Sequence, residues 1–178
     1  MKDEIVEGFL SSKQAKEKAR EELALLLDQK DPLFASFSEA DIGEPVLVRN
    51  LFGDPSYWMV PILNLGKTIG FARILGNGRI AHIGTFIRTL KEIDAAPINV
   101  TGISEIEARK IAKKNINSNQ GESITDPVFV HDGPIGREAW FVEVKKNDKP
   151  ESWLFITSSG MYKRQAGNMI DDIIDLFG

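Results

Sequence analysis

The sequence has no cysteine, only two histidines and no hydrophobic run of the ~20 residues that a membrane helix needs. Without cysteine, the chain cannot form disulfides, thiolate nucleophiles, zinc–thiolate sites or iron–sulfur clusters. The histidines His82 and His131 leave little room for a histidine metal cluster. The sequence also has no excess of positive charge, because it contains 22 Lys and Arg and 26 Asp and Glu, which gives a net charge of −4. This balance argues against a dedicated nucleic-acid-binding protein.

The remaining composition is that of a globular protein. The 178 residues are 42% hydrophobic and 27% charged, and a chain of this length buries roughly 70% of its unfolded surface without a metal or a disulfide. The length predicts one domain or two small ones. The first residues lack the apolar core of a signal peptide. We therefore expect a cytoplasmic protein, or a secreted or envelope protein if the sequence is a processed form.

Helical periodicity begins near the N-terminus. Residues 12–29 place Ala15, Ala19 and Leu23 on one face, with charged residues on the other. We expect Ser12 to be the N-cap of this helix, because a serine side chain can accept a hydrogen bond from the first turn. The helix is predicted to end before an Asp-Pro pair.

Two further helices are predicted in the second half of the chain. Ser104 and Glu107 have the S-x-x-E spacing of a capping box at the start of one. The other, at 168–177, has an apolar face and an acidic one, which we interpret as a solvated surface rather than a metal site; the acidic residues are Asp171, Asp172 and Asp175. We expect this C-terminal helix to pack on its own sheet, with an oligomer contact as the alternative.

Alternating apolar residues between the helices predict short strands. The expected strands are 45–48, 57–65, 68–75 and 79–86, then 128–130, 139–145, 152–157 and 161–164. Asn77 and Gly78 predict a two-residue hairpin of type I′, whose central positions both need positive φ. Pro61 has no N–H to donate, so its strand should lie at a sheet edge or be interrupted there.

An internal repeat relates the two halves of the sequence. A shift of 82 positions aligns 44–80 with 126–162 without a gap and gives 8 identities in 37 positions, where about two or three are expected by chance. The identities include Trp58 with Trp140 and the turn residue Gly78 with Gly160. The prediction is therefore an α+β fold of two tandem α-β-β-β(-β) units, 1–96 and 97–178. Each unit is an antiparallel meander packed on an amphipathic helix, and the two form separate domains or one compact pseudo-symmetric domain.

The second unit resembles the PepSY domain. The resemblance rests on the helix 104–114, the strand 139–144 with its Trp-Phe-Val core, and the strand 152–156. The first unit is similar through 57–61 and Gly78. The resemblance implies a cystatin-like fold and a non-catalytic binding module, of a kind found in peptidase propeptides and envelope proteins and proposed to restrain proteases. It implies no catalytic residues.

The residues themselves offer no catalytic, cofactor or metal site. Gly66-Lys67-Thr68 resembles the end of a phosphate-binding loop, but Pro61 occupies the position of the required first glycine, so a hairpin turn is expected. We interpret His82 and His131 as surface or strand-end residues rather than general bases. The three tryptophans, Trp58, Trp140 and Trp153, are expected in the core rather than at a ligand.

The loops 50–56 and 132–138 are the predicted site of partner binding. They carry apolar residues where loop tips are expected, at Leu51, Phe52, Pro134 and Ile135. A basic group in the second unit could contact an anionic partner or protect a strand edge; it comprises Lys145, Lys146, Lys149, Lys163 and Arg164. The leading hypothesis is a non-catalytic module that binds a protein partner, such as a protease or an envelope protein. The alternative is a small-molecule carrier or sensor with an apolar pocket between helix and sheet; an enzyme is disfavoured.

Overall fold

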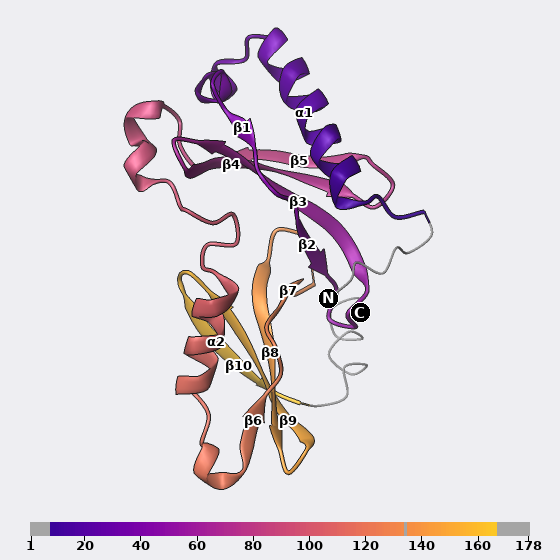
Figure 1. The fold of residues 1–178 in the computed structure, drawn as a ribbon, viewed down its shortest axis with the longest axis vertical. Helices are drawn as coiled ribbons and strands as arrows, with labels where there is room; N and C mark the ends of the chain where they lie inside the picture. The colour runs from indigo at the N-terminus through magenta and orange to yellow at the C-terminus, as the bar shows by residue number, and fades with distance from the viewer. Residues whose placement is uncertain (1–7, 134, 167–178) are drawn as a thin grey trace, which may run out of the picture.

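A computed structural model describes residues 8–133 and 135–166, and Figure 1 shows its fold. The first half of the chain forms helix α1 (Ser12–Asp28) and strands β1 (Asp41–Ile42), β2 (Val46–Arg49), β3 (Pro55–Asn64), β4 (Lys67–Leu75) and β5 (Ile80–Thr85). The second half forms α2 (Glu105–Lys114), β6 (Glu122–Ile124), β7 (Val128–His131), β8 (Glu138–Lys146), β9 (Lys149–Thr157) and β10 (Gly160–Gln165). Short 3₁₀ helices lie at Pro32–Phe37, Leu90–Ala95 and Ser118–Gln120.

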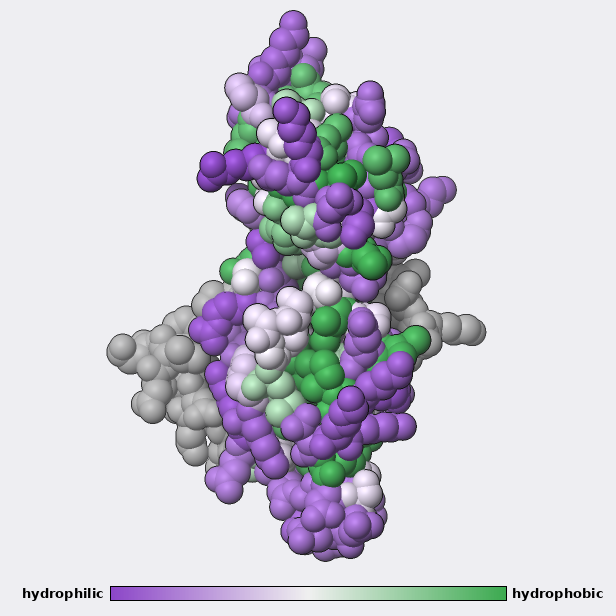
Figure 2. All heavy atoms as spheres, turned by 90° about the vertical axis from the view of Figure 1, so that its left-hand side faces the viewer, coloured by the Kyte–Doolittle hydropathy of each residue, from purple (hydrophilic) through white to green (hydrophobic). Residues whose placement is uncertain are grey.

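The described strands join in one sheet, in the order β10-β9-β8-β7-β2-β3-β4-β5, with β1 beside β3 and β6 beside β8. All neighbours are antiparallel except β2 and β7, which pair in parallel through Arg49 and Val130. The protein is therefore an α+β protein with a large, mostly antiparallel sheet and few helices, as the sequence predicts. The two halves meet at the β2–β7 pair near the middle of the sheet, and the space-filling view in Figure 2 shows an upper and a lower mass joined by a narrower region.

Helix α1 is capped one residue earlier than the sequence analysis predicts. Ser11, not Ser12, is the N-cap: its hydroxyl accepts from the backbone N–H of Gln14, and the Gln14 side chain accepts from the Ser11 N–H. This reciprocal pair is a capping box built with glutamine. Ala15 and Ala19 are buried as predicted, which brings the helix close to the sheet.

Helix α2 begins as predicted, with Ser104 and Glu107 forming a capping box. Ala108 and Ala112 are fully buried and seat this helix on the second half of the sheet. Small residues on the packed faces of both helices allow close contact with the strands, so helix position is set by direct packing.

A tryptophan ties the start of each helix to the sheet. The indole N–H of Trp58 in β3 donates to the carbonyl of Leu10 at 2.8 Å, and that of Trp140 in β8 donates to the carbonyl of Ile103 at 3.0 Å. Leu10 and Ile103 each immediately precede the N-cap of a helix. Both tryptophans are buried, in agreement with the prediction of core positions.

The hairpin turns only partly follow the sequence prediction. The β3–β4 turn has positive φ at Leu65 (48°) and Gly66 (75°), and the β8–β9 turn has it at Asn147 (51°) and Asp148 (62°), which is the pattern of type I′. The predicted type I′ turn at Asn77 is wrong, because only Gly78 of that pair has positive φ (84°). There the N–H of Gly78 donates to Leu75 in a three-residue loop closed by the left-handed glycine.

Pro61 lies within a continuous, internal strand, contrary to the expectation of an edge or a break. On one side of β3, Pro61 pairs with Phe71 of β4. On the other side, β2 pairs as far as Met59 and β1 begins at Ile62, so Pro61 falls where the partner strand changes. The missing N–H therefore costs no ladder hydrogen bond, and the Pro61 carbonyl still accepts from Gly43 at 2.9 Å.

The two helices lie on opposite faces of the sheet. Along β3, Trp58 and Val60 pack in the cluster with Ala15 and Ala19 of α1. The alternate residues Tyr57 and Met59 join the cluster of α2 instead. Because successive side chains of a strand point to opposite faces, α1 and α2 cover opposite sides. Figure 1 shows α1 beside the upper half of the molecule and α2 beside the lower half.

The cluster under α2 contains residues from both halves. Val48, Tyr57 and Met59 of the first half pack there with Phe129 and Trp140 of the second. The halves therefore share a core. The predicted C-terminal helix at 168–177, with its aspartates, lies outside the described residues. Among the described residues, no helix is both long and apolar enough to cross a membrane.

Candidate functional site

A buried ion pair joins the halves at the junction. Glu138, the first residue of β8, accepts from Arg73 of β4 through Nε at 2.7 Å and Nη2 at 3.1 Å. The hydroxyl of Tyr57 in β3 donates to the same carboxylate at 2.7 Å. The side chains of Arg73 and Glu138 are only 12% and 10% exposed. The pair is therefore a fixed, desolvated part of the junction rather than a surface salt bridge.

The electrostatics of this group keep its charges fixed at neutral pH. Burial raises the pKa of Glu138, but the hydrogen bonds from Arg73 and Tyr57 outweigh it, and the pKa lies below its ordinary value of 4.5. Burial, together with the hydrogen bond to Glu138, raises the pKa of Tyr57 well above its ordinary value. Tyr57 therefore remains a hydrogen-bond donor and Glu138 remains a carboxylate.

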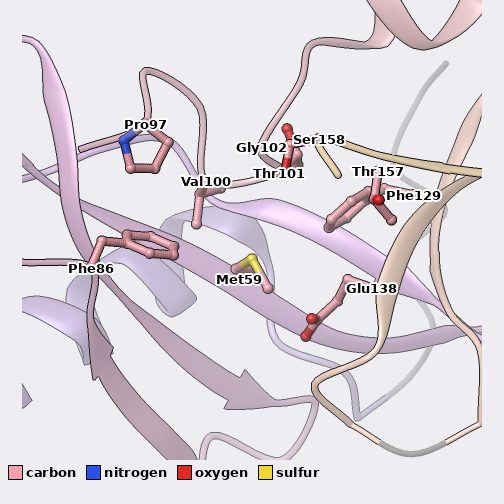
Figure 3. Close-up of a pocket in the computed structure, with 10 residues that line it drawn as sticks. All are labelled: Met59, Phe86, Pro97, Val100, Thr101, Gly102, Phe129, Glu138, Thr157 and Ser158. Carbon is pink, nitrogen blue, oxygen red and sulfur yellow. The ribbon is translucent and has the colours of Figure 1, made fainter. Parts of the chain in front are cut away.

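A hollow of about 320 Å³ opens beside this ion pair, between the halves. Figure 3 shows Phe86 and Val100 on one side and Phe129 and Thr157 on the other, with Met59 near the centre, between Val100 and Glu138. The walls come from β3, β7, the end of β9 and the segment 97–102, which connects the halves. The hollow combines apolar walls with hydroxyls and one carboxylate, which is the usual lining of a small-molecule site. It does not lie between a helix and the sheet, where the sequence analysis places a pocket.

His131 ends β7 and contributes to the junction as a structural residue. Its Nδ1 lies 2.5 Å from the carbonyl of Gly133, and its Nε2 lies 3.0 Å from Ser56 Oγ. Because a carbonyl only accepts, Nδ1 donates to Gly133, and Nε2 shares a hydrogen bond with the Ser56 hydroxyl. His131 thus joins the two loops that the sequence analysis selects, near their ends. His82 lies on the edge strand β5 and is exposed.

The predicted partner-binding residues differ in their surroundings. Phe52 and Ile135 are 60% and 48% exposed, as expected of loop tips. Leu51 instead is half-buried and packs in the cluster of Val130 and Ala139 on the second half. Pro134 lies outside the described residues.

The Phe52 loop is held by its own hydrogen bonds. Asn50 Oδ1 accepts from the N–H groups of Phe52 and Asp54, both at 2.9 Å, and the Arg49 guanidinium donates to the carbonyl of Gly53 at 2.8 Å. This Asx-type arrangement fixes the loop before any partner arrives.

Sequence reasoning missed Arg73, Glu138 and Tyr57. The available signal is an arginine inside the otherwise apolar run 69–75 of β4, where the neighbouring Ala72 and Ile74 are buried. Its partner cannot be read from the sequence, because Glu138 belongs to the other half. The predicted basic group is spread along the β8–β9 hairpin and the edge strand β10, and Lys145 and Lys146 lie 3.6 and 3.7 Å from Glu143 and Glu151.

Comparisons with known proteins leave the site to be interpreted from its geometry. Within 8–133 and 135–166, no group of three or more His, Asp or Glu is placed to hold a metal ion. Comparisons with protein-family models, curated proteins and solved structures found no match.

Proposed function

We propose that the protein is a non-catalytic binding module for a protein partner, built from two tandem PepSY-like units of cystatin-like type. The recurring elements support the tandem: β3 and β4 correspond to β8 and β9 under the 82-residue shift. The turn at Leu65-Gly66 corresponds to the turn at Asn147-Asp148, and both have the same backbone conformation. The indole bonds to the residues before each N-cap recur as well.

The observation that carries the binding function is the presentation of Phe52. Its ring is exposed on a loop held in place by four short-range hydrogen bonds that involve the side chains of Asn50 and Arg49. An exposed aromatic side chain on a preordered loop loses little entropy on binding and is typical of an interface hot spot. Ile135, exposed on the second loop, would add apolar contact area.

A protease is the partner class that the PepSY resemblance favours. The test is the residual activity of serine, cysteine, aspartic and metalloproteases after incubation with the intact protein. We expect dose-dependent inhibition of one class. Changing Phe52 and Ile135 to Ser should weaken inhibition at least about tenfold, as expected for the loss of a hot spot.

A matched control is Leu65→Ser, which removes another highly exposed apolar residue in the β3–β4 turn. It should leave inhibition unchanged. Equal inhibition by wild type and the Phe52/Ile135 variant would contradict the binding surface. Cleavage of the protein without inhibition of any class would contradict the protease-restraining role.

The junction hollow supports a second candidate, a small-molecule carrier or sensor. The observation that favours this candidate is the hollow of about 320 Å³ that Met59, Phe86 and Val100 help to line. Native mass spectrometry of gently purified protein should then show a bound small molecule. Met59→Trp, which fills the hollow, should abolish that mass without changing protease inhibition, and this separates the two functions.

A further inference from the structure

A second hollow, of about 490 Å³, lies at the N-terminal end of β10 and shares Glu138 and Thr157 with the first. Two guanidinium groups, Arg137 and Arg164, line it together with Tyr162. Apolar surface comes from Ala139 and the Tyr162 ring, and Ser159 and Met161 complete the lining. The hollow is thus basic on one side and apolar on the other.

A buried carboxylate holds both arginines in place. Asp132 Oδ2 accepts from Arg164 Nη2 at 2.9 Å, from Arg137 Nη2 at 3.0 Å and from the Tyr162 hydroxyl at 2.8 Å. The Asp132 side chain is 6% exposed, whereas those of Arg137 and Arg164 are 56% and 37% exposed. The buried carboxylate therefore holds both guanidinium groups in place, and the N–H groups that do not contact Asp132 stay accessible to solvent.

Among residues 8–133 and 135–166, the charges at this hollow do not cancel. Two guanidinium groups share the single carboxylate of Asp132, which leaves one positive charge in excess. Glu138 does not supply the missing negative charge, because it is paired with Arg73. Two cations held near each other repel, and an additional anion between them would be stabilised by both.

Aromatic stacking makes the same wall rigid. The Tyr162 ring stacks on Phe155 with ring centres 4.8 Å apart and an angle of 7°. The Arg164 guanidinium lies 5.4 and 5.6 Å from the centres of these two rings. Phe155 is fully buried, so Tyr162 and Arg164 are held against a fixed support. The site is therefore largely formed before a ligand binds.

We propose that this hollow binds a small molecule that carries an oxyanion group, a carboxylate or a phosphate, on an apolar body. The oxyanion contacts Arg137 and Arg164, and the apolar body lies against Ala139 and the Tyr162 ring. A volume of about 490 Å³ exceeds that of an inorganic anion alone, which is why the apolar body belongs to the ligand. The lining of this hollow includes neither Phe52 nor Ile135, the residues of the proposed protein-binding surface.

The test is calorimetric titration of the full chain with phenyl phosphate, benzoate, inorganic phosphate and the neutral benzyl alcohol. We expect saturable binding of phenyl phosphate or benzoate, and the tighter of the two identifies the oxyanion. Inorganic phosphate should bind at least about tenfold more weakly, because it lacks the apolar body. Benzyl alcohol should not bind measurably.

Charge variants localise the binding. Arg164→Gln and Arg137→Gln should each weaken binding about tenfold or more, the usual effect of losing one charge-assisted hydrogen bond. In either variant Asp132 keeps one arginine and Tyr162, so folding is retained, and circular dichroism checks this. The matched control is Lys163→Gln, which removes the same charge from the adjacent residue, on the other face of β10.

Two results would overturn the proposal. One is the absence of saturable binding of any of the anions to the wild-type protein. The other is an equal loss of affinity in Lys163→Gln and Arg164→Gln, which would reduce binding to general surface charge. Protease inhibition that is retained in Arg164→Gln shows that anion binding in this hollow and protease binding through Phe52 are separate.

Discussion

At the scale of single residues, removal of the Glu138 charge should be strongly destabilising. Glu138→Gln leaves the Arg73 guanidinium buried without a counter-charge, and breaking a buried pair from one side costs about 3–5 kcal/mol. Urea unfolding should show this loss of stability. A surface control is Glu21→Gln, whose partner Lys18 is exposed and whose loss should have little effect. Equal effects of the two changes would contradict a desolvated pair.

The same residue predicts a pH dependence. The pKa of Glu138 is lower in the folded protein than its ordinary value of 4.5. On acidification the unfolded chain takes up this proton first, so the contribution is complete above pH 4.5 and is lost as the pH falls through the folded pKa. Below pH 4.5 the wild-type protein should therefore lose stability more steeply than Glu138→Gln. Parallel pH profiles would show that other carboxylates dominate.

The tryptophans should differ in what their indole N–H contributes. Trp58→Phe and Trp140→Phe each remove a hydrogen bond to a carbonyl beside an N-cap and should cost about 1–3 kcal/mol. Trp153 is buried too, but its N–H finds no acceptor among the described residues. Trp153→Phe removes that unpaired donor and should cost less. A larger loss of unfolding free energy at Trp153 would contradict this ranking.

At the scale of elements, the β3–β4 turn holds a residue unsuited to it. Leu65 has a left-handed backbone and is 87% exposed, so its side chain gains little from packing. Leu65→Asn, which creates Asn-Gly, should raise the free energy of unfolding by about 1 kcal/mol. Asn77→Gly is the contrasting control and should destabilise, because Asn77 Oδ1 accepts from the Arg79 N–H. A gain at position 77 and none at 65 would contradict the turn assignments.

Local sequence patterns were sufficient to predict most helices and strands, but not the turn at Asn77 or the position of Pro61. The stripe of Ala15, Ala19 and Leu23 and the capping box at Ser104 are short-range signals, and both predict their helices correctly. Asn77 misleads because a three-residue loop and a two-residue loop use the same residues, and strand register decides between them. Pro61 misleads because the change of partner strand beside it depends on tertiary structure.

The candidate site was less predictable than the fold, because its parts come together only across the junction. Phe52 and Ile135 could be selected as apolar residues in polar loops. The burial of Leu51 could not, because it depends on strands of the other half. Arg73 and Glu138 meet only when β2 pairs with β7, and Arg137 and Arg164 converge only through Asp132.

At the scale of the whole molecule, the shared core predicts cooperative unfolding. Val48, Tyr57 and Met59 of the first half pack with Phe129 and Trp140 of the second, so neither half can form this cluster alone. Variants that retain only Trp58 or only Trp140, with the other tryptophans changed to Phe, report on one half each. In each variant the fluorescence and circular dichroism midpoints in urea should coincide. A Trp58 signal that changes at a different midpoint would show that the halves unfold separately.

The residues that the first half contributes to this shared cluster are exposed for a time during synthesis. Val48, Tyr57 and Met59 leave the ribosome roughly eighty residues before Phe129 and Trp140, which pack against them. At translation rates of about 5–20 residues per second, that apolar face lacks its packing partners for about 4–16 s. Throughout that interval the nascent chain presents a sheet face and an open β2 edge to solvent or to chaperones. The newly made protein is thus most exposed to misassembly before its second half has emerged.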